Sequence, residues 1–418
     1  MAIETRSPHF DNALLAPENW GDETGIHEYF TWMRKHDPLR YVEPDGFFPF
    51  WCVTKYEDIK EIEGHRDVFL NEPRMSLVPE AELERIRGLT GRKNLFRALP
   101  HMDAPDHSKY RMLAQPWFMG QKLRDFEKRV QTLASECVDR LAEHDGECDF
   151  VKDVAVWYPL RVIMEILGVP ASDEALMLKL TQEVFGSSDP DSRRSSNQEG
   201  SFASVADLQS YFRDFAAERR KHPTNDLGSE IANARVDGEL LTELEINSYL
   251  FMVATAGHDT TSASSSGGLH ALLTHPAEFA ALKSDVDDRL PGAIEEIIRW
   301  VTPVRHFQRT AAQDYELRGK TIREGEVVTL WYPSANRDEE IFDDPFTFRI
   351  ERKGPKQLAF GFGPHVCLGQ NLARMEMTAL FKELMNRVEH IELTAEPQYT
   401  QSNFVGGLKS MPIRYRMK

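Results

Sequence analysis

The feature that most constrains this chain is a glycine-rich turn that ends at a cysteine just before a helix. The turn, from Phe360 to Gly369, reads FGFGPHVCLG, and its glycines permit tight turns and a close approach of backbone to a ligand. The residues that follow carry an apolar face at helical spacing, so a helix should begin immediately after Cys367. A thiol at a helix N-terminus faces backbone N–H donors and the positive end of the dipole, which should lower its pKa. Cys367 is therefore predicted to be a ligand or a reactive group.

The other cysteines lack such surroundings, and Cys52, Cys137 and Cys148 are expected to be small core residues. Four scattered cysteines do not form a disulfide framework or a paired-cysteine metal site, which favours a reduced, cytoplasmic protein. The glycine spacing also departs from a dinucleotide-binding fingerprint, because Val366 stands where the third glycine belongs.

Charge and hydropathy exclude several classes of partner. The 418 residues include 50 Lys and Arg against 67 Asp and Glu, a net charge of −17. Such an acidic chain is not expected to bind nucleic acid or an anionic membrane surface as its main partner. The N-terminal residues contain neither a signal peptide nor an apolar run long enough to span a membrane, so a soluble protein is expected.

Helical periodicity dominates the chain. A capping box at Thr242 and Glu245 predicts the start of one long helix, which should run to His275 because Pro276 follows. Other predicted elements are a mostly helical stretch over 110–184 with a break at 168–170, a loop over 187–201 between two helices, and a helix that includes 294–300.

Short strands are predicted towards both ends of the chain. Residues 39–42 and 50–53 flank a Pro-Asp-Gly turn and should form a hairpin. Further strand-like segments are 315–322, 327–332 and 404–417. The expected architecture is mainly α with small β-sheets, in one domain over residues 1–418.

A second polar motif interrupts the predicted long helix. The sequence AGHDTTS, from Ala256 to Ser262, places a glycine, an acid and hydroxyls in the middle of an otherwise apolar helix. Hydroxyl side chains can bond carbonyls one turn back and open a helix locally. Taken alone, the Thr pair could simply satisfy itself in this way.

The cysteine turn resembles the haem-binding signature of the cytochrome P-450 monooxygenases, FxxGxxxCxG, matched at Phe360, Gly363, Cys367 and Gly369. The resemblance implies haem b (iron protoporphyrin IX) between a long distal helix and the cysteine loop, with Cys367 as the thiolate ligand of iron. Thiolate ligation favours O–O cleavage. Phe360 would pack near the sulfur.

The same resemblance assigns the helix motif. Thr260 would bind dioxygen and Asp259 would supply protons, because O–O cleavage needs protons delivered to the distal oxygen. Ala256 and Gly257 would lie against haem, with Gly257 leaving room for dioxygen. His258 would point about 100° away on a regular helix and is interpreted as structural.

The resemblance also assigns two further sets of residues, a buried salt-bridge cluster and the side chains that hold the haem propionates. Glu296 and Arg299, an ExxR pair that alone would be a weak surface salt bridge, would be buried behind the haem and joined by Arg337. The two haem propionates would be held by four cationic or hydrogen-bonding side chains, namely His107, Arg111, Arg309 and His365.

The chain resembles most the soluble bacterial P-450s that hydroxylate monoterpenes, especially terpineol. This implies a monooxygenase that acts on a small apolar monoterpenoid or alkyl-aromatic hydrocarbon, with dioxygen, a ferredoxin and a ferredoxin reductase. Arg111 and Arg374 would present positive charge to an acidic ferredoxin. The substrate pocket is predicted from the 96–100 loop and from Met252, Thr255, Val304, Phe307 and Val405.

Two alternatives remain open at this point. A haem-thiolate protein could carry out peroxide-driven or non-oxygenase chemistry, and dependence on dioxygen and a reductase would distinguish it. A haem sensor or carrier would not need the acid–alcohol pair, and turnover would exclude it.

Overall fold

The computed structural model describes residues 8–185, 189–191 and 198–418. Helices form most of it, as the periodicity predicts. In the described ranges the helices are α1 Pro8–Ala13, α2 Thr24–His36, α3 Tyr56–Gly64, α4 Glu80–Thr90, α5 Asp106–Phe118, α6 Gln121–Asp139, α7 Trp157–Leu167, α8 Glu174–Phe185, α9 Gln198–Lys221, α10 Leu227–Ala232, α11 Glu243–Ala256, α12 Asp259–Thr274, α13 Pro276–Ser284, α14 Val286–Val301, α15 Tyr332–Ala335 and α16 Gln370–Arg387.

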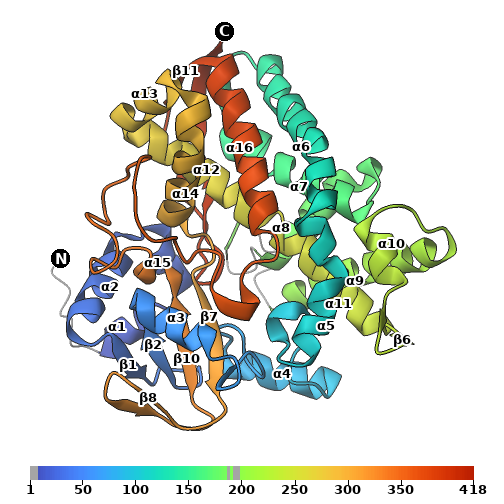
Figure 1. Cartoon of the computed structure of the whole chain (residues 1–418), viewed down its shortest axis with the longest axis vertical. Helices are drawn as coiled ribbons and strands as arrows, with labels where there is room; N and C mark the ends of the chain where they lie inside the picture. The colour runs from blue at the N-terminus through green and yellow to red at the C-terminus, as the bar shows by residue number, and fades with distance from the viewer. Residues whose placement is uncertain (1–7, 186–188, 192–197) are drawn as a thin grey trace.

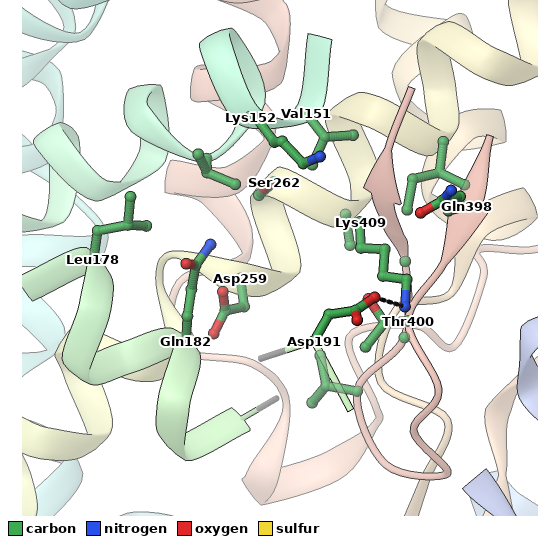
Figure 2. Close-up of a pocket in the computed structure, with 16 residues that line it drawn as sticks. Val151, Lys152, Leu178, Gln182, Asp191, Asp259, Ser262, Gln398, Thr400 and Lys409 are labelled. Atoms are coloured by element: carbon green, nitrogen blue, oxygen red, sulfur yellow. Dashed lines mark hydrogen bonds and ion pairs between the residues drawn. The ribbon is translucent and has the colours of Figure 1, made fainter. Parts of the chain in front are cut away.

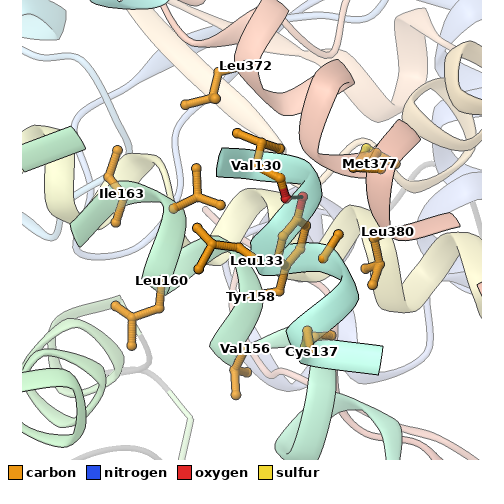
Figure 3. Packing of buried hydrophobic residues seen from close by; sticks show 14 of the residues in the cluster. Val130, Leu133, Cys137, Val156, Tyr158, Leu160, Ile163, Leu372, Met377 and Leu380 are labelled. Atoms are coloured by element: carbon orange, nitrogen blue, oxygen red, sulfur yellow. Dashed lines mark hydrogen bonds between the residues drawn. The ribbon is translucent and has the colours of Figure 1, made fainter. Parts of the chain in front are cut away.

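The main hydrophobic core lies among the helices. Figure 1 shows α6, α12, α14 and α16 running close together above the sheet, and α16 packs against α6 and α14. At this contact Leu133 and Leu380 are buried around Tyr158 of α7, whose hydroxyl donates to the Glu376 carbonyl at 3.1 Å (Figure 3). Cys137 is fully buried in the same cluster, as predicted for a core cysteine.

The strands form a smaller layer that joins distant parts of the chain. The predicted hairpin is confirmed: β1 Leu39–Val42 pairs antiparallel with β2 Phe50–Val53. A five-stranded sheet then has the order β1-β2-β10-β7-β3, with β3 Phe69–Leu70, β7 His306–Ala311 and β10 Val327–Trp331. Every residue of β10 is buried, since it lies inside this sheet between β2 and β7.

The remaining strands are short. They are β4 Glu147–Asp149, β5 Arg235–Val236, β6 Glu239–Leu240, β8 Tyr315–Leu317, β9 Lys320–Ile322, β11 Val388–Leu393, β12 Gln398–Tyr399, β13 Leu408–Ser410 and β14 Pro412–Met417. Strand β14 lies between β11 and β4, so the C-terminus pairs with a strand inside the stretch that we predicted to be mostly helical.

The long central helix is broken, which corrects the prediction of one continuous helix over 242–275. Its capping box at Thr242 is present, but α11 ends at Ala256 and α12 starts at Asp259. At Gly257 a Cβ would lie 2.8 Å from the Ile163 side chain and 3.1 Å from the Val253 carbonyl oxygen. Glycine therefore lets α11 approach α7 at the break.

The predicted loop over 187–201 falls partly outside the described residues. Residues 198–201 belong to α9, which shortens the loop at that end. Asp189 is fully buried and accepts from the Gln401 amide at 2.8 Å, so this part of the segment is attached to the C-terminal region. Over the ranges described, no helix has the length and apolar character needed to cross a membrane.

Candidate functional site

The cysteine turn is fastened to α3 through Glu63. Gly363 has a φ of +68°, and a Cβ there would lie well inside 3.0 Å of the Glu63 carbonyl oxygen. The Phe362 amide donates to Glu63 Oε2 at 2.8 Å, and the Cys367 amide donates to the Phe360 carbonyl at 2.8 Å. Gly363 is thus required both by its left-handed conformation and by the close approach to α3.

The Cys367 thiol sits at the start of α16, where the sequence placed it. Burial raises its pKa, while backbone donors from Gly369 and Gln370 and the nearby Arg111 and Arg374 lower it. Burial outweighs them, so the expectation of a lowered pKa is wrong for the chain by itself. Because a buried thiolate requires a compensating cation, this sulfur suits a metal ligand better than a free nucleophile.

The four predicted propionate residues come together near this turn. The rings of His107 and His365 lie 3.8 Å apart between centroids, and Arg111 donates to the Val366 carbonyl at 2.8 Å. Burial and neighbouring cations, Arg111 and Arg309 among them, lower the pKa of His107 to about 4 and that of His365 to about 2.

Anionic partners are scarce in this cluster. Arg309 is paired with buried Glu63 at 3.1 Å, and His107 Nε2 is buried without a hydrogen-bond partner in the described structure. Sequence reasoning missed Glu63, because its partner Arg309 is far away in the chain. The charge of Arg111 and the hydrogen-bonding capacity of the two histidines fit a group with carboxylates, and a haem, with two, is such a group.

The distal motif lies at the helix break. Ala256 is exposed, although Thr255 before it and His258 two residues later are buried. Thr260 Oγ1 donates to the Ala256 carbonyl at 2.9 Å. A Cβ at Gly257 would lie 2.8 Å from the Ile163 side chain, and the predicted role of Gly257 in leaving room for dioxygen stays a prediction.

Asp259 is in contact with His258, which corrects the prediction that the His258 side chain points away from it; the structural role predicted for His258 stays a prediction. The His258 Nδ1 to Asp259 Oδ1 distance is 3.2 Å. The prediction assumed a regular helix, on which neighbouring side chains diverge by about 100°. Here the helix is broken at His258, so the two side chains can meet. Burial raises the pKa of Asp259, and His258 opposes that shift.

A cavity of about 440 Å³ lies beside Asp259 (Figure 2). Its wall comes from α8, α12, the short helical turn Val151–Ala155 before α7, the β12–β13 region and Asp191. The lining residues are Val151, Lys152, Val156, Leu178, Gln182, Asp191, Asp259, Ser262, Ala263, Gln398, Thr400, Val405, Gly406, Gly407, Leu408 and Lys409. Figure 2 shows Gln182 and Asp259 extending into the same part of it.

Of the five single residues predicted for a substrate pocket, only Val405 lines this cavity. Thr255 is buried with its hydroxyl bonded to the Phe251 carbonyl at 2.8 Å. Phe307 packs on Phe404 and Tyr332, while Val304 pairs with Val405 in a β-bridge. Met252 is half-buried on α11 and is not among the lining residues. The sequence could not show these neighbours because they come from distant segments.

The ExxR pair is buried as predicted, but its third member is different. Glu296 binds Arg299 through two hydrogen bonds of 2.7 Å each. Arg352 also donates to both Glu296 oxygens, at 3.0 and 3.1 Å. Arg337 instead donates to the Trp300 carbonyl at 2.8 Å. The error arose because Arg337 and Arg352 both follow the pair in sequence, and only folding decides which one reaches the carboxylate.

Comparisons with known proteins agree with this geometry. A family model described as Cytochrome P450 matches residues 194–417. Cytochrome P450-terp from a Pseudomonas species is 39% identical over 426 residues, covering 99% of each protein. The crystal structure of CYP108D1 from Novosphingobium aromaticivorans superposes with a TM-score of 0.90 at 40% identity, covering 99% of both chains. Cytochrome P450 CYP268A2 of Mycobacterium marinum, in complex with pseudoionone, superposes with a TM-score of 0.88 at 31% identity, covering 95% of this chain and 97% of that one.

Proposed function

The chain belongs to the cytochrome P450 family and is a monooxygenase, and from this premise we propose that it hydroxylates a small apolar monoterpenoid or alkyl-aromatic hydrocarbon. The proposed electron donors are a ferredoxin and its reductase, and the proposed cofactor is haem b within one domain over residues 1–418. The overall reaction consumes the substrate, dioxygen, two electrons and two protons, and releases the hydroxylated product and water. The observation that carries the proposal is a half-buried thiol just before α16, beside Arg111, Arg309 and two histidines whose lowered pKa values leave them as neutral hydrogen-bonding groups.

The residues suit the haem that the family binds. Cys367 would ligate iron, and His107, Arg111, Arg309 and His365 would bind the two propionates. Haem held in this way supplies the chemistry that activates dioxygen and inserts one oxygen atom into a C–H bond. Phe360, whose ring centroid lies 4.6 Å from the Arg374 guanidinium, would pack near the sulfur and help to exclude water from the ligand.

Proton supply is assigned to the distal motif. Asp259 Oδ2 is buried without a partner among the described residues, and the side chain borders the cavity. We assign to this carboxylate the transfer of protons from the cavity towards Thr260 Oγ1. The pKa of Asp259 is raised by burial, which brings it closer to the range in which a carboxyl both accepts and releases a proton.

The substrate class rests on resemblance and on the character of the cavity wall. The wall is mixed: Val151, Val156, Leu178, Val405 and Leu408 provide apolar surface, which holds a hydrocarbon at roughly 25 cal/mol per Å² buried, while Lys152, Asp191 and Lys409 add charged groups, so resemblance carries most of the assignment. Similarity to a protein named Cytochrome P450-terp, and to another crystallised with pseudoionone, supports the same class. Turnover restricted to long-chain acids in a substrate panel would refute this assignment.

The ferredoxin is expected to bind near the thiolate. Arg111 and Arg374 both act on the Cys367 thiol, so they lie on that side of the protein. Arg374 is partly neutralised by a salt bridge with Glu295, which leaves Arg111 as the stronger contribution to a positive surface.

The first test is the spectrum of the dithionite-reduced protein under carbon monoxide. Thiolate ligation predicts a strongly red-shifted Soret band, which should be lost in Cys367→His and kept in Cys148→Ser, a half-buried cysteine far along the chain. A band in the ordinary histidine-haem position in the wild type would refute the assignment of Cys367. Product formation with dioxygen and a ferredoxin, against peroxide alone, then separates the monooxygenase from the peroxide-driven alternative.

A further inference from the structure

Arg305 is a buried arginine between α14 and β7, and its side chain is only 1% exposed. Its Nη2 donates to Glu23 Oε1 at 2.7 Å, and its Nη1 donates to the Ser402 carbonyl. The guanidinium also lies 4.2 Å from the centroid of the Trp20 ring. A planar guanidinium makes all three contacts at once, so two segments that are distant in sequence hold this group in one place.

The backbone around Arg305 is joined to the 402–407 segment, which forms part of the cavity wall. The Arg305 amide donates to the Phe404 carbonyl at 2.9 Å. Val304, one residue earlier, pairs with Val405 in a β-bridge. Val405 is itself a lining residue of the cavity beside α12. Arg305 therefore lies directly behind a part of this wall, without lining the cavity itself.

Two glycines of the 402–407 segment bring this wall close to its neighbours on both sides. A Cβ at Gly406 would lie well inside 3.0 Å of the Arg305 guanidinium. A Cβ at Gly407 would lie 2.5 Å from the Ala263 side chain of α12. Neither glycine has a positive φ, so close approach is what requires glycine at these two positions. The guanidinium and α12 together fix where the 402–407 segment lies.

We propose that Arg305 is a positioning residue that sets the distance between the 402–407 segment and α12, and thereby the carbon atom at which the substrate is hydroxylated. The proposal rests on the proposed function, in which this cavity holds the hydrocarbon. Glu23 and Trp20 share the role because they hold the guanidinium, although neither of them lines the cavity. Residues near the N-terminus therefore influence which product forms, through one buried side chain.

The first experiment measures the ratio of hydroxylated positions that the holoenzyme forms from α-terpineol with ferredoxin, its reductase and dioxygen. This ratio does not depend on how much of the protein is folded. Gly406→Ala should change it by about tenfold, at the low end of what one methylene group discriminates in an apolar pocket. In an Arg305→Leu background the same substitution should change it by less than about twofold, because the leucine side chain ends before the guanidinium. An equal effect of Gly406→Ala in both backgrounds would overturn the proposal.

Two further sets of variants serve as controls for the same ratio. Gly407→Ala should change it alike in both backgrounds, because its added Cβ meets α12 and not Arg305. Glu23→Ala removes the acceptor of Arg305 Nη2 and should shift the ratio in the same direction as Arg305→Leu. Glu23→Gln keeps an oxygen for that donor and should restore much of the wild-type ratio. A merely structural role would lower the melting temperature alone, so an unchanged ratio in Glu23→Ala and Arg305→Leu would overturn the proposal.

A measurement that does not depend on turnover completes the design. Crystal structures of the haem-loaded wild type, Gly406→Ala and Arg305→Leu/Gly406→Ala should show the 402–407 segment displaced in the single variant and back in place in the double variant. A segment that does not move in Gly406→Ala would overturn the proposal, because the guanidinium would then have yielded instead. A wild-type protein that binds haem but forms no product from α-terpineol would instead refute the proposed substrate class, while the crystal structures would still decide whether Arg305 positions the wall.

Discussion

Replacing Gly363 by alanine should damage the cysteine turn in a way that an ordinary turn glycine does not. Alanine at this position would have to adopt the left-handed backbone conformation, with φ of +68°. Its Cβ would also clash with the backbone carbonyl of Glu63, which cannot rotate away. The conformation alone costs about 1–2 kcal/mol. Moving the turn off α3 also breaks the hydrogen bond from the Phe362 amide to the buried Glu63 carboxylate, which contributes about 1.5–3 kcal/mol. The expected loss of unfolding free energy is about 2.5–5 kcal/mol.

Gly46 offers a matched control. Its φ is +76°, similar to that of Gly363, but no atom lies within 4 Å of the position of its Cβ. Gly46→Ala should therefore show only the conformational cost. For a chain of 418 residues, the melting temperature should fall by about 3–6 °C in Gly363→Ala and about 1–2 °C in Gly46→Ala.

Thermal unfolding followed by circular dichroism measures the first quantity, and the reduced carbon monoxide spectrum measures haem retention. Gly363→Ala should also lose part of the thiolate band, because the turn that carries Cys367 must shift. Equal melting temperatures for the two variants, with an unaltered band in both, would refute the reasoning that the contact with Glu63 positions this turn.

Four other predictions concern residues that the structure places in defined surroundings. Arg352→Ala should lower the unfolding free energy by about 3 kcal/mol, measured by urea denaturation, because buried Glu296 loses a charged partner. Burial lowers the pKa of His306 from 6.5 to about 3, and its Nε2 accepts a backbone N–H at 3.0 Å. The unfolded state therefore binds the proton first as pH falls, so stability present above pH 6.5 is lost progressively towards pH 3, and His306→Gln should flatten this part of the urea midpoint profile. Thr260→Ala should lower product per NADH while leaving the carbon monoxide spectrum unchanged; retained coupling would count against its role in proton supply. Arg374→Gln should slow reduction by the ferredoxin at low ionic strength in stopped-flow measurements, and an unchanged rate would remove it from the docking surface.

Local patterns were reliable wherever a few neighbouring residues determine the outcome. The hairpin at β1 and β2 was predicted to the residue because its turn and flanking apolar runs are adjacent in sequence. The start of α11 was likewise set by a capping box of two residues three positions apart. A local opening at 256–262 was anticipated from its glycine and hydroxyl residues, but the division into α11 and α12, beside the close approach of Gly257 to Ile163 of α7, was not.

The candidate site likewise has a part that the sequence identifies and a part that only the folded structure decides. Cys367, its glycines and the acid–alcohol pair form short motifs that sequence alone identifies, and with them come the fold class and the expectation of haem. Which arginine completes the Glu296 cluster, which residues line the cavity, and that His258 meets Asp259 depend on segments that are distant in the chain or on a helix that does not continue. Sequence determines the local donors and turns, because their partners are a few bonds away. Tertiary packing decides burial and contact, and these set which carboxylates are paired and which carboxylate oxygen remains free.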